Sequence, residues 1–223
     1  MSFWRQVIAI AQKDITAELR SREIISSVLV FAVLVLVIFN FAFTAGQETM
    51  LALAPGILWV AFTFAGVLAL NRAFIPEKEE NCLEGLLACP AGREVIYAGK
   101  ALSGLFFLLL VEVVILPVFS IFFNVNIFRF EFIIIILLGT IGFTAVGIVF
   151  SAVAVNTRAR EMVLPVLFLP VVSPIVIAAV ESSELALSGR SWSDMTVWLI
   201  ILLAFDIIFT VLPFLIFSYV IEE

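Results

Sequence analysis

The sequence predicts an all-α integral membrane protein with six transmembrane helices and an N-terminal interfacial amphipathic helix. Apolar residues make up 64% of the chain and charged residues only 13%, whereas an ordinary soluble domain is about half apolar and a quarter charged. The mean hydropathy is +1.24. Several apolar runs reach the roughly 20 residues that a helix needs to cross a bilayer. The net charge of −6 therefore says less about partners than the position of each charge does.

The first segment, residues 2–20, is amphipathic rather than uniformly apolar. It is too polar to span a membrane and lacks the continuous apolar core of a signal peptide. We expect it to lie in the membrane interface, with Trp4 at the headgroup level; the alternative is an ordinary solvated helix. The residues that line its apolar face are Trp4, Ile8, Ala11, Ile15 and Leu19.

Six spans follow, within a single domain over residues 1–223 that shows no internal repeat. The spans are expected at about 24–44, 51–70, 101–123, 132–155, 162–180 and 197–220, and a polar loop occupies residues 71–100. The fourth span carries small residues that let a neighbouring helix approach closely. These residues are Gly139, Gly142, Gly147 and Ser151.

The fifth span is interrupted by Pro165, Pro170 and Pro174. Each proline removes a backbone donor, so we expect this helix to be broken or kinked. In lipid the freed carbonyls need partners inside the protein. The segment is therefore predicted to be buried at a protomer interface or along a cavity.

The basic residues predict the orientation, because cytoplasmic loops carry an excess of Lys and Arg. With a cytoplasmic N-terminus, only Arg129 and Arg190 of the 12 basic residues lie on the far side. Six spans then return the C-terminus to the cytoplasm. Cys82 and Cys89 would lie in the cytoplasmic loop, where thiols stay reduced. The remaining basic residues are Arg5, Lys13, Arg20, Arg22, Arg72, Lys78, Arg93, Lys100, Arg158 and Arg160.

The polar loop contains a short candidate helix between Pro76 and Cys89-Pro90. Its leucines fall at helical spacing and give a narrow apolar stripe, while two glutamates one turn apart remain in water. An amphipathic helix held at the membrane surface accounts for this pattern; the alternative is a solvated loop whose leucines merely dock on the bundle. The residues concerned are Glu80, Leu83, Glu84, Leu86, Leu87 and Pro90.

Two ionisable residues, Glu112 and Asp206, lie within spans. Each costs roughly 2.5–3.5 kcal/mol at mid-membrane on insertion scales, so each is expected to face the bundle interior, a cavity or a partner helix. They could line a substrate route or form a proton site; alternatively, each makes a structural hydrogen bond.

Other chemistry is poorly supported by the sequence. The chain has no histidine, the commonest metal ligand and general base, and we expect neither a metal site nor catalytic residues. No Walker A pattern occurs, so the chain does not hydrolyse nucleotide by that route. Cys89 before Pro90 could be a thiolate ligand for heme iron, but the proline is better explained as the end of the loop helix.

The loop segment EENCLEGLLACPAGREVIYAGK, the first-span segment LVFAVLVLVIFNFAF and the segment NTRAREMVLPVLFLPVVSPIVIAAV resemble the membrane subunits of type-2 ABC exporters. The resemblance is closest to the CcmB family, the permease of the heme exporter for cytochrome c maturation. It covers nearly the whole chain, and its most specific part is the cytoplasmic turn with Arg158, Arg160 and Glu161. One departure is Glu80 to Glu84, where the family commonly has a glycine followed by a hydroxyl residue.

This resemblance implies a homodimer in a bacterial cytoplasmic (inner) membrane, with both termini cytoplasmic, that pairs with a cytoplasmic ATPase of the CcmA type. The loop helix would then be a coupling helix. Membrane heme-handling proteins of the CcmC and CcmD type are further implied partners, and no nucleic acid is expected. ATP would act through the partner subunit, and heme is implied as a transported or handled ligand, with no cofactor bound tightly by this chain.

Several functions remain open at this point. Within the family, the subunit either moves heme or drives release of a heme-loaded chaperone. The chain could instead be a type-2 ABC permease for a lipid, glycan or drug. An ion-coupled transporter using Glu112 and Asp206 is a third hypothesis, although the absence of visible repeats counts against it. A passive assembly scaffold is the fourth.

Overall fold

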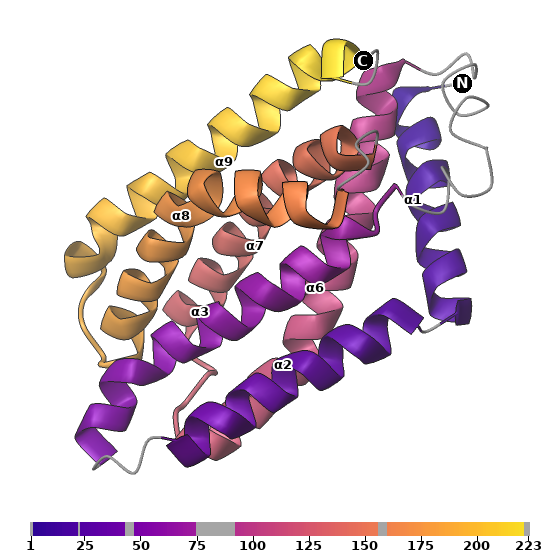
Figure 1. The fold of residues 1–223 in the computed structure, drawn as a ribbon. Coiled ribbons are helices and arrows are strands. Elements are labelled where there is room, and N and C mark those ends of the chain that lie inside the picture. Colours follow the sequence, from indigo (N-terminus) through magenta and orange to yellow (C-terminus); the bar gives the residue numbers. More distant parts are fainter. Residues whose placement is uncertain (1, 22, 43–46, 75–91, 156–159, 221–223) are drawn as a thin grey trace.

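The computed structural model describes residues 2–21, 23–42, 47–74, 92–155 and 160–220, and this part of the chain is helical apart from short turns. Figure 1 shows the long helices side by side in one bundle, with α1 standing across one end of it. The helices are α1 (Phe3–Ser21), α2 (Glu23–Ala42), α3 (Gln47–Asn71), α6 (Arg93–Phe123), α7 (Phe130–Val155), α8 (Arg160–Leu187) and α9 (Trp192–Val220).

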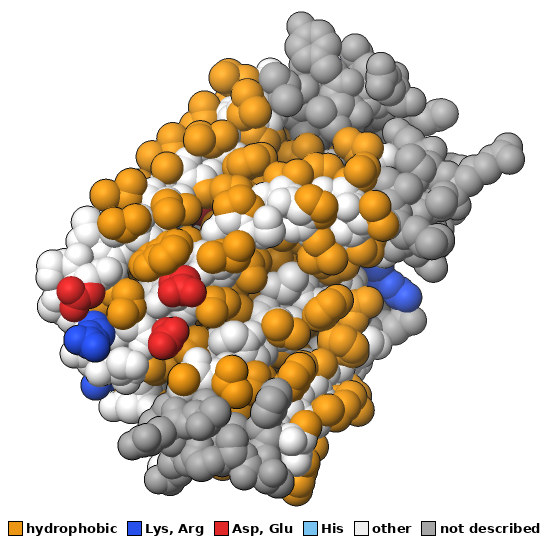
Figure 2. Space-filling model, turned by 60° about the vertical axis from the view of Figure 1, so that its left-hand side comes forward, with side chains coloured by type: hydrophobic (Ala, Val, Ile, Leu, Met, Phe, Trp, Pro, Cys, Tyr) orange, Lys and Arg blue, Asp and Glu red, His pale blue; other side chains and the backbone are white. Residues whose placement is uncertain are grey.

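Six of these helices, all but α1, are long and apolar enough to cross a membrane, which confirms the predicted number of spans. They divide into central and peripheral helices. The spans of α3 and α7 are each 67% buried, whereas those of α2 and α9 are 17% and 22% buried. Figure 2 shows apolar side chains over most of the described part of one face, with most of the few charged ones gathered on its left-hand side. Since that surface is apolar, it suits lipid or a second membrane protein.

The small residues of α7 allow the close helix packing that the sequence predicts. A Cβ atom added at Gly139 would lie 2.3 Å from the Trp59 ring, and one added at Gly147 would lie 2.2 Å from the Leu70 side chain. Both distances are too short for non-bonded carbon atoms. Glycine at these two positions therefore lets α3 lie directly against α7.

The interfacial helix α1 has three faces rather than two. Val7 and Ala11 are buried, and α1 packs mainly on α6. Trp4, Ile8 and Leu19, which the sequence assigns to the apolar face, are exposed. Ala11 is therefore the one residue of the predicted stripe that is buried against the protein. The exposed apolar face is the one suited to lipid, and the charged side chains occupy the rest of the helix.

The helix that contains the third span begins several residues before the expected start of that span. Residues 93–100 were assigned to the loop, but α6 begins at Arg93 and its first turns are buried. Tyr97 is buried, and its hydroxyl lies 3.2 Å from the carbonyl oxygen of Phe209, to which it donates. Tyr97 and Lys100 form their hydrogen bonds within the protein, so they are buried despite their polar groups.

The far ends of α8 and α9 also differ from the expected spans. The fifth span was expected to end at residue 180, but α8 continues to Leu187; the sixth was expected to begin at 197, but α9 begins at Trp192. Ser182 and Ser183 turn into the protein, while Glu181 and Glu184 are exposed. The helix thus remains amphipathic where the sequence becomes polar.

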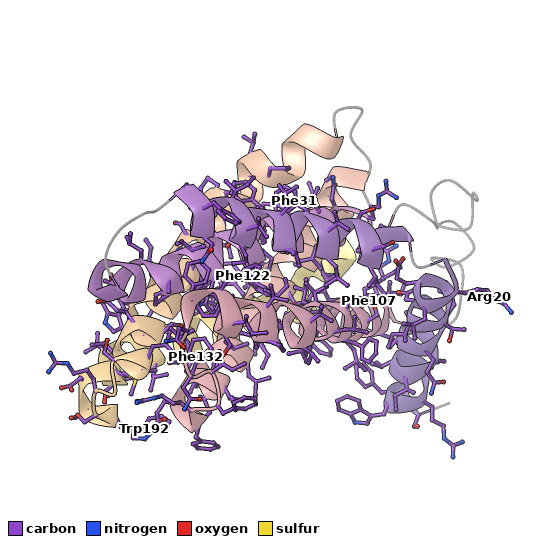
Figure 3. All side chains as sticks on the ribbon, turned by 90° about the horizontal axis from the view of Figure 1, so that it is seen from below. Arg20, Phe31, Phe107, Phe122, Phe132 and Trp192 are labelled. Carbon is purple, nitrogen blue, oxygen red and sulfur yellow. The ribbon has the colours of Figure 1, made fainter. Side chains whose placement is uncertain are left out.

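The two ends of the bundle carry different groups. The ring of Phe3 at the start of α1 lies 5.9 Å from that of Phe214 in α9, so the N-terminal helix and the last turns of α9 share one end. Arg129, one of the two basic residues assigned to the opposite side, donates to the carbonyl of Ala186 at the end of α8. Figure 3 shows Arg20 and Trp192 at opposite ends of the molecule.

Candidate functional site

The predicted coupling segment lies outside the described residues, and so do Cys82 and Cys89. Arg158 also lies outside them, whereas Arg160 and Glu161 belong to the first turn of α8. The predictions for these positions therefore remain predictions. The loop residues concerned are Glu80, Leu83, Glu84, Leu86, Leu87 and Pro90.

The structure does describe the frame that holds the two ends of this segment. After α3 the chain turns, with the Ala73 amide donating to the carbonyl of Leu70 at 3.1 Å, and the Phe74 side chain is buried. On the other side, Gly92 precedes the first turn of α6, and its carbonyl accepts a bond from the Val95 amide. The loop therefore begins directly after the buried Phe74 and ends at the start of α6; we call these two points its anchors.

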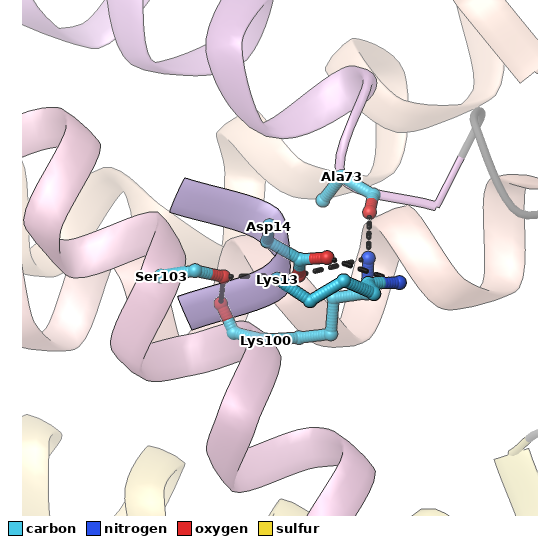
Figure 4. A network of polar contacts seen from close by, with 5 residues as sticks. All are labelled: Lys13, Asp14, Ala73, Lys100 and Ser103. Carbon is cyan, nitrogen blue, oxygen red and sulfur yellow. Dashed lines mark hydrogen bonds and ion pairs between the residues drawn. The ribbon is translucent and has the colours of Figure 1, made fainter. Parts of the chain in front are cut away.

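A buried lysine connects these two anchors with α1 (Figure 4). The side chain of Lys100 in α6 is only 3% exposed. Its ammonium group donates to the carbonyl oxygen of Ala73 at 2.7 Å and forms an ion pair with the Asp14 carboxylate of α1 at 3.0 Å. The same nitrogen lies 5.1 Å from the centre of the Phe74 ring. One cation therefore contacts the end of α3, the interfacial helix and its own helix.

The Asp14 carboxylate is satisfied by further groups. Its Oδ2 accepts a bond from the Ser103 hydroxyl at 3.3 Å, and its Oδ1 lies 3.2 Å from the ammonium of Lys13, whose side chain is 52% exposed. Buried charges are tolerated when they are paired and hydrogen-bonded. We name Asp14, Lys100, Ser103 and the Ala73 carbonyl the junction cluster.

Sequence reasoning missed the junction cluster because it counted Lys100 as one more cytoplasmic charge. A signal was present: Lys100 is flanked by Gly99, Ser103 and Gly104, small residues that permit a helix to approach. A Cβ added at Gly99 would lie 2.7 Å from Ile10 and 3.2 Å from the backbone carbonyl of Val7. The small residues mark the place where α1 lies against α6.

Glu112 in α6 faces the bundle interior, as expected for a carboxylate within a span. It is 6% exposed, and one oxygen is hydrogen-bonded to the Thr140 hydroxyl of α7. The other oxygen has no hydrogen-bond partner among the described residues. Glu112 also borders a small cavity of about 10 Å³ with Trp59 and Phe62, which is about the size that holds one water molecule.

Trp59 fixes the wall of this cavity. Its indole nitrogen donates to the Ser183 hydroxyl of α8 at 3.0 Å, and its ring occupies the space above Gly139. The residue therefore joins α3, α7 and α8 beside Glu112. The position of this aromatic ring keeps the cavity small, at about 10 Å³.

Asp206 in α9 is also buried, at 7% exposure, but on another side of α7. A Cβ added at Gly142 would lie 2.3 Å from the Asp206 carboxylate and equally near the Ile175 side chain. Thr140 and Gly142 are two residues apart, which separates their directions by about 200° around a helix. Glu112 and Asp206 therefore contact opposite sides of α7 and do not line one shared polar site.

The sequence predicts a break or a kink at Pro165, Pro170 and Pro174, and of the two there is no break, since α8 is one helix from Arg160 to Leu187. Figure 1 shows its ribbon changing direction along its length. Pro174 cannot bond to the carbonyl of Pro170, and the Ser173 hydroxyl takes its place as donor at 2.8 Å. This substitution of one donor for another explains why the helix continues.

The prolines lie on the outer side of the monomer. Pro170 and Pro174 are exposed, whereas Phe168, Val172 and Ile175 on the same helix are buried. The predicted burial along an internal cavity is therefore not found for these two prolines. Burial at an interface between protomers stays a prediction.

Comparison with known proteins agrees with the architecture. The model of the family described as CcmB protein matches residues 5–221. Heme exporter protein B of Pseudomonas aeruginosa is 27% identical over 83% of this chain and 83% of its own length. The protein of the same name from Bradyrhizobium diazoefficiens is 28% identical over 81% and 82%, and that of Rhodobacter capsulatus is 26% identical over 78% and 80%. With the family match covering almost every described helix, the chain belongs to the CcmB family.

Proposed function

We propose that this chain is the membrane permease subunit of an ABC transporter complex that acts in heme export or heme-chaperone release during c-type cytochrome biogenesis. The observation that carries the proposal is the family match over residues 5–221, together with relatives named heme exporter protein B. Six apolar spans fit a subunit that forms the path through a membrane. This subunit is a transporter component rather than an enzyme.

The ATPase would be a separate cytoplasmic subunit of the CcmA type that docks on residues 75–91. Support comes from the two buried anchors, Phe74 and the start of α6, between which this segment is held. Because the segment is fixed to the bundle at both ends, a displacement of the segment by the ATPase would be transmitted to the spans. CcmC- and CcmD-type membrane proteins would complete the complex.

Deletion and complementation test the proposed role. Removing the gene should abolish the c-type cytochromes, which are detected by staining for their covalently bound heme. Restoring the gene should recover them. If the deletion strain makes as much c-type cytochrome as the parent strain, the proposal is wrong. That result is expected for a permease of a lipid, glycan or drug. A strain that lacks ATPase activity but keeps its cytochromes would instead indicate a passive scaffold.

Docking of the ATPase is tested by charge reversal in the loop. Glu84→Lys should leave membrane insertion intact, because exposed ion pairs contribute only about 0–1 kcal/mol to stability. It should weaken ATPase co-purification, since a like-charge contact in an interface costs several kcal/mol. Lys78→Glu is the matched control, because residue 78 lies away from both the Glu80 and Glu84 face and the leucine stripe if the segment is helical.

Leu86→Asp tests the other face of the same segment. This change should detach the predicted helix from the spans, so that the ATPase still binds while cytochrome yield falls. If Glu84→Lys retains full ATPase binding and full yield, Glu84 has no role in docking. If Leu86→Asp has no effect on yield, the leucines do not transmit motion.

Two copies of the chain are proposed to assemble, because one protomer offers half of the symmetry that a paired ATPase needs. The first and fifth spans are the proposed contacts, and both carry exposed apolar residues, including Leu34 in α2 and Ile177 in α8. Single cysteines at these positions, with Cys82 and Cys89 replaced by serine, should cross-link to a dimer in native membranes. Recovery of monomer alone at every tested position would contradict dimerisation through these spans.

The proposed orientation places both termini and the loop in the cytoplasm of a bacterial inner membrane. It is supported by the shared end of Phe3 and Phe214 and by the distribution of the basic residues. An impermeant thiol reagent should label Cys82 and Cys89 in inverted vesicles and leave them unlabelled in intact spheroplasts. Labelling from outside would reverse the orientation.

A further inference from the structure

We infer that the buried Asp14–Lys100 ion pair is a positioning contact that makes the interfacial helix α1 and both ends of the 75–91 loop move as one unit. The inference concerns residues that the proposed docking segment does not contain. Its coupling role rests on the proposed function, because it assumes that an ATPase acts on this loop. The contact itself rests only on the geometry of the junction cluster.

The first step is the position of the lysine between the loop ends. Lys100 belongs to α6, which follows the loop, and it donates to Ala73, which precedes the loop, at 2.7 Å. The carbonyl groups at the end of a helix carry partial negative charge, so a cation is favoured there. The ammonium group therefore holds the exit of α3 against the first turns of α6. Both ends of the loop share one rigid base.

The second step is the attachment of α1 to this base. Asp14 pairs with Lys100 at 3.0 Å and accepts a bond from Ser103, one turn further along α6. On the same side of α1, Ile10 and the Val7 carbonyl lie against Gly99 with no room for a side chain. The ion pair and the close contact lie side by side. Together they fix the position of α1 along the axis of α6 and its rotation about its own axis.

The third step is the burial of the charges. The Lys100 side chain is 3% exposed and that of Asp14 13%. Removing one partner of a buried pair takes away the nearest compensation of the other charge, which is more costly than breaking an exposed pair. A displacement of α1 that separated the two groups would meet the same penalty. The pair therefore resists independent motion of α1 and the loop base.

This arrangement predicts a mechanical consequence for ATPase action. A displacement of the loop moves its base and, through Asp14, moves α1 with its exposed Trp4 and Ile8. The interfacial helix then acts as the part of the subunit that carries loop motion to the membrane surface. Without the ion pair, the ATPase could still bind and hydrolyse ATP, but its motion would not reach α1.

The experiment compares four variants of the full chain in the purified complex: Asp14→Asn, Lys100→Met, the double variant and Lys13→Met. Lys13→Met is the matched control, since it removes the other cation beside Asp14 at a half-exposed position. Amide hydrogen exchange over residues 10–18 measures the attachment of α1. ATPase co-purification, ATP turnover and c-type cytochrome yield measure coupling.

Each single variant should speed exchange in α1 by about tenfold or more, while Lys13→Met leaves it within about twofold. The ATPase should co-purify and hydrolyse ATP with Asp14→Asn, while cytochrome yield falls several-fold. The double variant should be less impaired than the two single effects combined, because no unpaired charge is left. If Lys100→Met fails to accumulate, Asp14→Asn and the double variant decide.

If α1 exchanges its amide hydrogens at the wild-type rate in Asp14→Asn and in the double variant, the ion pair is not a positioning contact. Faster exchange with unchanged cytochrome yield would overturn the coupling role and leave a purely structural pair. A wild-type complex that contains no ATPase would overturn the proposed function. The exchange arm would still decide whether the ion pair attaches α1.

Discussion

The junction cluster and the Glu112 site place charged groups in the same bundle and treat them in opposite ways. Lys100 and Asp14 compensate each other, and a hydroxyl and a backbone carbonyl complete their bonds. Glu112 has one hydroxyl partner, an oxygen without a partner among the described residues and a cavity of about 10 Å³ beside it. The first site joins three helices through charge. In the second, Trp59 joins helices largely through packing.

The two sites derive their rigidity from different interactions. At the junction cluster, the loss of either charge removes the closest opposite charge from the other at a buried position, so the contact depends on both groups. At the Glu112 site the helices are held by the Trp59 ring, which Gly139 admits and Ser183 anchors. The carboxylate can therefore be changed without releasing the helices. Three substitutions test this contrast.

Lys100→Glu is expected to have the largest effect. It places a second carboxylate beside Asp14 and against the carbonyl of Ala73, so the loss should exceed the roughly 3–5 kcal/mol that follows removal of one buried partner. The variant should fail to accumulate in the membrane or should unfold far below the wild type in detergent. Lys13→Glu, at a half-exposed position beside the junction cluster, is the control and should accumulate normally. Wild-type thermal unfolding of Lys100→Glu would show that the ion pair does not hold α1.

Gly139→Val should have an intermediate effect. Its side chain would occupy the place of the Trp59 ring, which already lies 2.3 Å from an ideal Cβ, and overpacking of this kind costs about 1–3 kcal/mol. The indole should lose its bond to Ser183, which tryptophan fluorescence and thermal unfolding would detect. Gly56→Val is a control in α3, where a Cβ meets no atom within 4 Å. Equal stability of the two variants would show that Trp59 does not lock the helices.

Glu112→Leu should have the smallest effect on stability. Without Glu112, the one Thr140 hydroxyl proton still has the carbonyl of Ile136 as an acceptor at 2.8 Å, and replacing a poorly satisfied polar group by an apolar one is close to neutral, within about 1 kcal/mol. Thermal unfolding of Glu112→Leu and Glu112→Gln should both resemble the wild type. A large loss of stability would contradict the contrast. A fall in cytochrome yield at unchanged stability would assign the carboxylate a role in transport.

The number and order of the helices could be predicted because hydropathy is a property of each segment by itself. Twenty apolar residues must cross the bilayer as a helix, whatever their neighbours are. Helix ends were less predictable, since they depend on where polar groups find partners. Tyr97 and Lys100 looked like loop residues and instead bond to Phe209 and Ala73 inside the protein. Likewise, Ser173 supplies the donor that Pro174 lacks, and the predicted break or kink is a change of direction within one continuous helix.

Contacts between distant segments could not be predicted from one sequence. The two intramembrane carboxylates were correctly expected to face the interior. Nothing in their spacing indicated that α7 would separate them. The pairing of Asp14 with Lys100 was equally hidden, because charge counting treats both as residues of the aqueous side. Only the small residues around Lys100 pointed to a helix contact there.

The distance along the chain between the partners of Asp14 has a consequence for biosynthesis. Asp14 and Ser103 are separated by 89 residues, which a ribosome adds in on the order of five to twenty seconds. During that interval the first two spans are synthesised, but Lys100 and Ser103, which bind Asp14, are not yet part of the chain. The exposed stripe of Trp4, Ile8 and Leu19 gives α1 a second support, the lipid surface itself. We expect α1 to bind the bilayer surface before α6 is synthesised and to contact α6 once the third span has inserted.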